Sequence, residues 1–202
     1  MLRDLYIKNS QLPLRYQKEI PLTVSALDID AFNALDTIRT NIDTFVAEGN
    51  NLLLCSQNVG NGKSTWMSKL LKEYINRVSK YAHPNNCPAL FLNINNFLND
   101  KKLAMNDSNL MNHIIETEKN IFSAKLVVFD DLCVKNLSEF DMNNLYRWID
   151  YRTSNCLSTM YTSNLLPEQL RQSLDERIYS RLVNYSKVII IKDGDHRARS
   201  GR

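Results

Sequence analysis

The sequence has little glycine, proline or cysteine, and it contains no long apolar run. Only five glycines and five prolines occur among 202 residues, which excludes a long flexible linker or a low-complexity region. No apolar segment approaches the length of a membrane span, and the first residues lack a signal-peptide pattern. We therefore expect a cytoplasmic protein with no membrane contact.

The cysteines are few and scattered, which excludes two further classes of protein. They form no CxxC pair and have no nearby histidine cluster, so neither a zinc site nor a disulfide framework is indicated. Most stand in or beside apolar runs, and we expect buried, reduced thiols at Cys55, Cys87, Cys133 and Cys156.

The composition that remains is typical of one globular domain. Hydrophobic residues make up 44% and charged residues 23% of the chain, and this length suffices for one α/β domain with a buried core. The net charge of +3 permits a nucleic-acid partner without arguing for one. Residues 1–30, which contain Pro13 and Pro21, predict an extended N-terminal arm that lies on a domain formed by residues 31–202.

Short apolar runs alternate with segments of helical periodicity along this domain. We expect helices at 31–48, 63–80, 139–152 and 167–182, the last broken near Ser173, and a mostly polar helical region that ends near 122. We expect strands at 51–56, 88–94, 126–129, 157–162 and 186–191. Strands separated by helices form a parallel sheet that is covered on both faces. The sequence thus predicts an α/β fold, a three-layer sandwich around a five-stranded parallel sheet.

A glycine-rich loop between the first strand and the next helix carries the strongest chemical signal. It consists of Gly60, Asn61, Gly62, Lys63, Ser64 and Thr65. Glycine lets backbone N–H groups approach a phosphate, Lys63 supplies a cation, and the helix contributes its positive end. The Ser64 hydroxyl would hold Mg²⁺. The loop predicts an ATP site, although the full motif has glycine where this chain has Gln57; a turn without a ligand is the alternative.

Two acidic residues follow the third strand, at the edge where the carboxyl ends of parallel strands meet. Asp130 is expected to reach the metal on the phosphates, and Asp131 to polarise the attacking water. Many such ATPases have glutamate at the second position, so the shorter Asp131 leaves the hydrolysis rate open. A capped turn is the alternative interpretation of the pair.

The last third of the chain contains candidate sensors of the γ-phosphate. The end of the fourth strand resembles AAA+ P-loop ATPases, in which a polar residue contacts the γ-phosphate; Asn164 is the candidate here, with a helix N-cap as the alternative. Arg177 and Arg181 are four residues apart and share a helix face. Either one could reach the nucleotide of a neighbouring subunit, or both could belong to a solvated basic face. In the tail, Arg197 or Arg199 could act as a second sensor within the chain.

Several segments together resemble the DnaC/DnaI-type AAA+ helicase loaders and their IstB-like transposition relatives. The resemblance spans residues 10–200 and rests on Gly60-Asn-Gly-Lys-Ser, Leu126-Val-Val-Phe-Asp-Asp, Tyr161-Thr-Ser-Asn, Asp175-Glu-Arg-Ile-Tyr-Ser-Arg-Leu, Asp195-His-Arg-Ala-Arg and Leu12-Pro-Leu-Arg-Tyr. It implies a protein that binds ATP and Mg²⁺ between subunits of a homo-oligomer, hydrolyses ATP, contacts single-stranded DNA and loads a hexameric replicative helicase.

The same resemblance implies roles for individual residues. It favours Arg181 as the arginine finger, with Arg177 next, and Arg197 as the second sensor. These loaders usually carry a separate helicase-binding domain, so the arm has that role or the contact lies elsewhere; a chain this compact would suit a phage or prophage version. The segment 95–120 could be a DNA-facing insertion, and Lys101 and Lys102 form its one adjacent basic pair.

Three other functions stay open at this point. An IstB-like transposition ATPase differs little from a loader in sequence. A small P-loop kinase would need an arginine-bearing lid, and the segment 95–120 is poor in arginine. A nucleotide-binding protein without meaningful hydrolysis would be consistent with Gln57 and Asp131.

Overall fold

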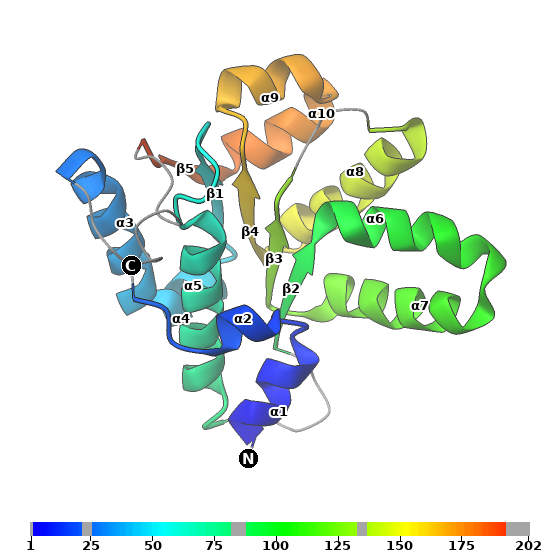
Figure 1. The fold of residues 1–202 in the computed structure, drawn as a ribbon, viewed down its shortest axis with the longest axis horizontal. Helices are drawn as coiled ribbons and strands as arrows, with labels where there is room; N and C mark the ends of the chain where they lie inside the picture. Colours follow the sequence, from blue (N-terminus) through cyan, green and yellow to red (C-terminus); the bar gives the residue numbers. More distant parts are fainter. Residues whose placement is uncertain (1, 22–25, 82–87, 133–136, 193–202) are drawn as a thin grey trace, which may run out of the picture.

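The computed structural model describes residues 2–21, 26–81, 88–132 and 137–192, and five parallel strands form its centre (Figure 1). The strand order across the sheet is β2-β3-β4-β1-β5. The strands are β1 (Asn51–Cys55), β2 (Ala89–Asn93), β3 (Leu126–Asp130), β4 (Ser158–Ser163) and β5 (Ser186–Ile190). Each lies within one residue of its predicted bounds.

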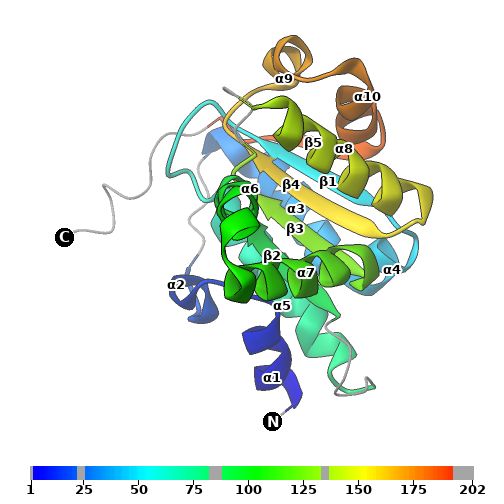
Figure 2. The ribbon, with the colours of Figure 1, turned by 90° about the vertical axis from the view of Figure 1, so that its right-hand side faces the viewer.

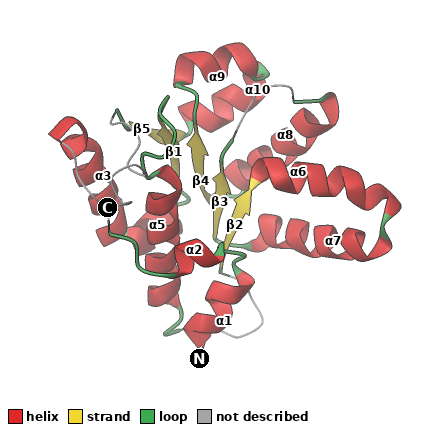
Figure 3. Cartoon of the chain, viewed as in Figure 1, coloured by secondary structure: helices red, strands yellow, loops and turns green. Residues whose placement is uncertain are grey.

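Two groups of helices enclose the sheet (Figure 3). One layer contains α1 (Leu2–Asn9), α2 (Leu14–Gln17), α3 (Ile29–Thr40), α4 (Ile42–Ala47) and α5 (Lys63–Val78), with a short 3-10 turn at Ala26–Asp28. The other contains α6 (Ile94–Leu103), a 3-10 turn (Ala104–Asn106), α7 (Ser108–Ser123), α8 (Glu139–Ser154), α9 (Pro167–Ser173), α10 (Glu176–Tyr179) and a π-helical turn (Ser180–Asn184).

The strand residues alternate between these two layers. Leu52 and Leu54 belong to the core cluster under α5, whereas Leu53 and Cys55 belong to the cluster under α8. This alternation follows from the two-residue period of a strand, and burial on both sides explains why β1 has no polar face. The predicted three-layer α/β fold with a five-stranded parallel sheet is confirmed.

A fully buried arginine fixes the second layer against the sheet. The Arg152 guanidinium donates hydrogen bonds to the carbonyl oxygens of Ile121 (2.6 Å), Ala124 (2.9 Å) and Ser158 (2.6 Å) and to Thr159 Oγ1 (2.8 Å). Burial lowers the pKa of Arg152 to about 10. These bonds give each nitrogen of the buried group a partner and join the end of α7 to α8 and the start of β4.

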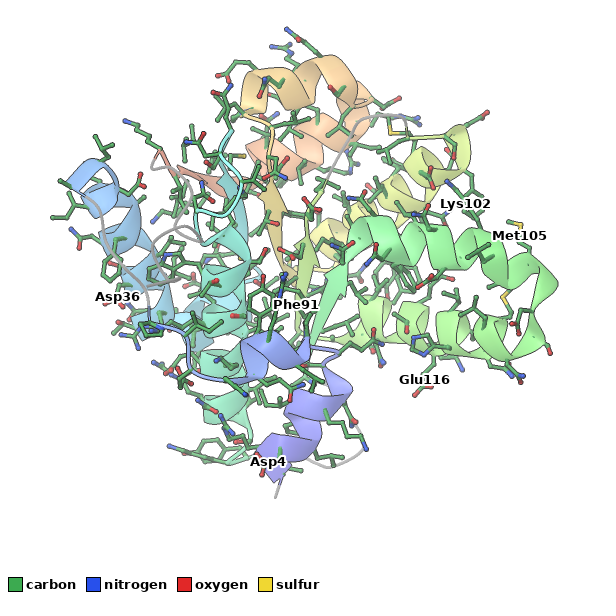
Figure 4. The ribbon with its side chains drawn as sticks, in the orientation of Figure 1. Asp4, Asp36, Phe91, Lys102, Met105 and Glu116 are labelled. Carbon is green, nitrogen blue, oxygen red and sulfur yellow. The ribbon has the colours of Figure 1, made fainter. Side chains whose placement is uncertain are left out.

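Along the chain, the helices α6 and α7 follow β2 and precede β3, and they form a hairpin that points toward the viewer in Figure 2. Figure 4 labels Lys102 and Met105 on its outer part. Lys101 Nζ lies 2.5 Å from Glu118 Oε1, and Lys102 Nζ lies 2.6 Å from Asp141 Oδ2 on α8. Both lysines thus pair with carboxylates within the chain, and a DNA-facing role of the segment 95–120 stays a prediction.

The first residues are helical, so the predicted extended conformation of the arm is wrong. Tyr6 is fully buried, and the Tyr16 ring lies 6.0 Å from the ring of Phe91 on β2. The Phe91 N–H donates to the Ser10 carbonyl (2.7 Å), and Lys72 Nζ donates to the Lys18 carbonyl (3.0 Å). Helical turns place the apolar side chains of this segment on one side, against α5 and β2, where they gain burial. The boundary after residue 30 stays a prediction.

The cysteines divide into two groups. Cys55 is buried as predicted, but Cys156 is exposed, so the prediction of a buried thiol there is wrong. Cys156 lies in the tight turn between α8 and β4 with φ 51°, and a turn of this kind runs over the surface. Cys87 and Cys133 lie outside the described residues. No helix in the described part of the chain is long and apolar enough to cross a membrane.

A glycine is required where this turn meets the end of α4. Gly49 has φ 69°, and a Cβ atom at this position would collide with the backbone of Cys156. We expect Gly49→Ala to lower the free energy of unfolding by about 1–3 kcal/mol, measured by urea denaturation. Glu48→Ala, at the exposed preceding residue, is the control and should change it by less than about 0.5 kcal/mol. Equal urea midpoints for Gly49→Ala and the wild type would contradict this close approach.

Candidate functional site

The glycine-rich loop leaves the carboxyl end of β1 and leads directly into α5. Gly60 and Gly62 have φ values of 79° and 91°, a region that glycine adopts without steric cost. Among the described residues other than glycine, positive φ occurs only at Gln11, Asp131 and Cys156. Gln57 therefore does not need the backbone freedom of the glycine that the full motif places there.

The loop encloses the ammonium group of Lys63, whose residue is 8% exposed. Lys63 Nζ donates to the Asn58 carbonyl (3.0 Å) and to Asn61 Oδ1 (3.2 Å). The Asn61 amide in turn donates to Ser56 Oγ. The first N–H of α5 to bond within the helix is that of Trp66, to the Gly62 carbonyl (2.9 Å). The amides before it lie in the first turn, where an α-helix can bind an anion.

Asp130 lies at the end of β3 and is 4% exposed. Its carboxylate accepts a hydrogen bond from Thr162 Oγ1 (2.8 Å) and another from the Ser64 hydroxyl. Burial raises the pKa of Asp130 above its ordinary value, and the charge of Asp131 raises it further; the two hydrogen bonds and the charge of Arg15 act against this rise.

Asp131 turns the chain sharply out of β3, and polar groups from other elements hold it. It has φ 59°, which an aspartate tolerates better than most residues. Its N–H donates to Thr162 Oγ1 (2.7 Å), and its carbonyl accepts from Asn95 Nδ2 (2.6 Å). Its carboxylate oxygen Oδ1 accepts from Asn164 Nδ2 (3.1 Å). Two neighbouring side chains thus hold the backbone of Asp131, and Asn164 holds its carboxylate.

Asn164 follows β4, and its side chain is directed at Asp131 rather than at the next helix. The residue at the N-cap of α9 is Leu166. The interpretation of Asn164 as a helix cap is therefore wrong, and its amide is bonded to the second acid of the site.

Three residues of this site were missed in the sequence. Thr162 bridges the two acids, Asn95 holds the backbone of Asp131, and Arg15 of α2 adds a positive charge near Asp130. The register pairs Phe129 with Tyr161, which puts the next residues, Asp130 and Thr162, at the same level of the sheet. A threonine near the end of a strand is an ordinary strand residue, so only its position opposite Asp130 reveals it.

The candidate arginines lie elsewhere. The guanidinium groups of Arg177 and Arg181 lie 4.9 and 5.6 Å from the centroid of the Tyr146 ring on α8. Arg181 also pairs with Asp150 of α8, and Arg177 Nε lies 3.0 Å from Asp175 Oδ1. Both arginines contact the same ring, so the predicted shared face is confirmed, although α10 ends at residue 179 and a π-helical turn carries Arg181. The predicted break at residue 173 is also confirmed, because α9 ends there. Arg197 and Arg199 lie outside the described residues.

The structure thus brings together the loop, the two acids and Asn164, and it places Arg177 and Arg181 in a separate group between α8 and α10. No protein-family model matches the chain, and no curated protein matches it. Its similarity to solved structures is extensive. The crystal structure of the DnaC helicase loader is similar with a TM-score of 0.67 and 20% sequence identity, covering 89% of this chain and 100% of that one. The DnaI structure has a TM-score of 0.64 and 20% identity, covering 92% of this chain and 94% of that one.

The chain has the AAA+ P-loop NTPase fold. A structure of the replication initiator DnaA bound to AMPPCP and single-stranded DNA is also similar, with a TM-score of 0.65 and 15% identity. It covers 90% of this chain, which spans 51% of that DnaA chain. The resemblance to DnaC-type loaders is therefore confirmed at the level of the AAA+ fold.

The donors in this site fit a magnesium ion. In the described part of the chain, no group of three or more His, Cys, Asp or Glu side chains is placed to hold a metal by itself. Ser64 and Asp130, which are hydrogen-bonded to each other, offer a hydroxyl and a carboxylate oxygen. Mg²⁺ is commonly held by one or two such protein oxygens, with substrate phosphates and water as its other ligands.

The raised pKa of Asp130 predicts a stability effect with a defined sign. At neutral pH, the buried and ionised Asp130 lowers the free energy of unfolding. This cost disappears as the pH falls below the pKa that Asp130 has in the unfolded chain. We expect Asp130→Asn to unfold at higher urea than the wild type at pH 7, without nucleotide, and to lose this advantage as the pH approaches about 4. Asp100→Asn, at an exposed position on α6, is the control. An Asp130→Asn protein less stable than wild type at pH 7 would contradict the burial cost.

Proposed function

We propose that this chain binds and hydrolyses ATP and uses it to load a hexameric replicative helicase onto single-stranded DNA during replication initiation. The observation that carries the proposal is the group formed by the Gly60–Thr65 loop, Asp130, Asp131 and Asn164, in a chain with the fold of DnaC and DnaI. We further propose that residues 31–202 form the ATPase domain and residues 1–30 its arm.

The phosphates of ATP would bind over the loop. The backbone from Gly60 to Thr65 supplies N–H groups at the start of α5, and Lys63 brings a positive charge to the β- and γ-phosphates. A magnesium ion held by Ser64 and Asp130 would neutralise charge on these phosphates. The cost of burying Asp130 would then be offset by a cation, which is consistent with its raised pKa in the protein alone.

The second acid would act on the attacking water. The Asp131 carboxylate would accept a proton from this water as the bond to the γ-phosphorus forms. Asn164 donates to one oxygen of that carboxylate, and from this position it would sense the γ-phosphate. Thr162 joins Asp131 to Asp130, so the water site and the metal site would keep a constant separation.

A further positive charge would come from a second copy of the chain. Among the described residues, Arg177 and Arg181 contact α8 and the start of α10, and not the glycine-rich loop or the acidic pair that follows β3. If an arginine of the neighbouring subunit completes the site, hydrolysis would require a homo-oligomer formed with ATP. The Lys101 and Lys102 pair does not support DNA binding by the hairpin; single-stranded DNA enters the proposal from the loader fold and from the DnaA complex.

Substitutions in the loop and at the water site test the enzyme directly. We expect Lys63→Ala to lose ATP binding, whereas Asp131→Asn should retain binding and hydrolyse ATP about 10²–10⁴-fold more slowly, because it cannot accept the proton. Binding would be measured with a fluorescent ATP analogue and hydrolysis by phosphate release. Lys69→Ala, on the same helix but outside the loop, is the control for Lys63→Ala. ATP binding that survives Lys63→Ala would contradict the proposed site.

Dependence on concentration, DNA and helicase tests the loader. Hydrolysis per chain is expected to rise with protein concentration or with single-stranded DNA, because the neighbour completes the site. In the presence of a replicative hexameric helicase, ATP and the protein should together increase unwinding of a DNA with a single-stranded gap. Hydrolysis that is independent of concentration and DNA, with transfer of phosphate to a small acceptor, would instead indicate a kinase.

A further inference from the structure

Both candidate arginines contact the same aromatic ring, that of Tyr146 on α8. The Arg177 and Arg181 guanidinium groups lie 4.9 and 5.6 Å from the centroid of Tyr146, within the range of cation–π attraction. We call Tyr146, Arg177 and Arg181, together with Asp150, the arginine seam. It joins the middle of α8 to α10 and the π-helical turn.

The arginine seam lies on the side of the sheet away from α5. The core residues Ile178 and Leu182, which flank the two arginines in sequence, pack in the cluster under α8, whereas α5 packs in the other cluster. The groups that determine the pKa of Asp130 include Ser64, Thr162 and Arg15. The arginines instead bond to Asp150 and Asp175. Among the described residues, their partners thus lie on α8 and at the start of α10, and none of these partners belongs to the loop or to the pair Asp130 and Asp131.

The two arginines lie on a short helical segment that changes its helix type between them. The α10 helix spans four residues, Glu176–Tyr179, and a π-helical turn follows it. By contrast, α8 has 16 residues, a capping box at Ser138 and Asp141, and the fully buried Trp148. A ring on α8 therefore offers the arginines a firmer surface than their own helix does.

Holding a guanidinium against a ring reduces the conformational entropy that it loses when it reaches a phosphate. An arginine side chain loses much of its rotamer freedom when it is fixed, and orientation in advance lowers the barrier of the reaction that it assists. Arg181, with a side chain 32% exposed, is also held by Asp150, while the Arg177 side chain remains 65% exposed above the ring.

We propose that Tyr146 is a positioning residue that orients the arginines of one chain toward the nucleotide site of its neighbour. This inference rests on the proposed ATPase function and adds a residue to it. The aromatic face is the part of Tyr146 that matters, because both contacts are made to the ring.

The first measurement compares two substitutions of the ring under saturating ATP and single-stranded DNA. Tyr146→Ala is expected to lower kcat about 10-fold and to leave ATP binding unchanged, whereas Tyr146→Phe, which keeps the aromatic face, should retain kcat within about 2-fold. Tyr151→Ala is the matched control, since Tyr151 is an exposed aromatic residue of the same helix that contacts Phe122 instead. A Tyr146→Ala protein with the kcat of the wild type would overturn the proposal.

The second measurement mixes variants, because an arginine that acts on a neighbour can be supplied by a different chain. Lys63→Ala chains lack the phosphate contact but keep the arginine seam, and Tyr146→Ala chains have the reverse defect. Their mixture should hydrolyse ATP several-fold faster than the sum of the two alone. A mixture of the Arg177→Ala/Arg181→Ala double variant with Lys63→Ala is the reference, because the Lys63→Ala chains would supply the missing arginines directly.

The outcomes separate this inference from the proposed function. If the arginine double variant is rescued and Tyr146→Ala is not, Tyr146 serves its own chain and the positioning role is wrong. If the double variant hydrolyses ATP like the wild type while Lys63→Ala does not, the ATPase assignment stands and there are no arginines for Tyr146 to position. If the wild type itself neither binds nor hydrolyses ATP, both the proposed function and the inference fail.

Discussion

The structure depends on one hydroxyl group at the edge of the sheet. Thr162 Oγ1 donates to the Asp130 carboxylate and accepts the N–H of Asp131, at 2.8 and 2.7 Å. These two bonds fix the end of β3 against the end of β4, so the chain leaves the sheet at a defined place and angle. Asn95 and Asn164 then hold the second acid from α6 and from the segment after β4. The ends of β3 and β4 and the start of α6 meet at this point because parallel strands end together.

Charged groups are buried at both ends of β4, Arg152 at its start and Asp130 beside its end, and they differ in how the protein compensates them. Arg152 is fully buried, and four hydrogen bonds satisfy it within the chain. The carboxylate of Asp130 accepts neutral hydroxyl donors, and its pKa stays raised. Arg152 therefore has the properties of a structural charge, whereas Asp130 has those of a group that becomes more favourable when a cation binds.

Helix α8 contacts two regions that are far apart in the sequence. Asp141 pairs with Lys102 of the hairpin, and the Trp148 indole donates to Glu118 of α7 (2.9 Å). Further along, Tyr146 and Asp150 hold the arginines. The same helix thus supports the α6–α7 hairpin through one set of contacts and the arginine seam through another. These contacts place both regions at defined positions against α8.

The sequence by itself determined the order of the elements, the glycine-rich loop and the acids after β3, because periodicity and turn chemistry are local properties of the chain. It did not reveal Thr162, Asn95 or Tyr146, whose roles depend on the register of strands and on packing between distant helices. The tertiary structure also decided that Gln57 needs no positive φ, that Asn164 faces Asp131 and that Cys156 is exposed. A side chain's partners are set by which segments meet in space, and residue type and spacing do not encode that.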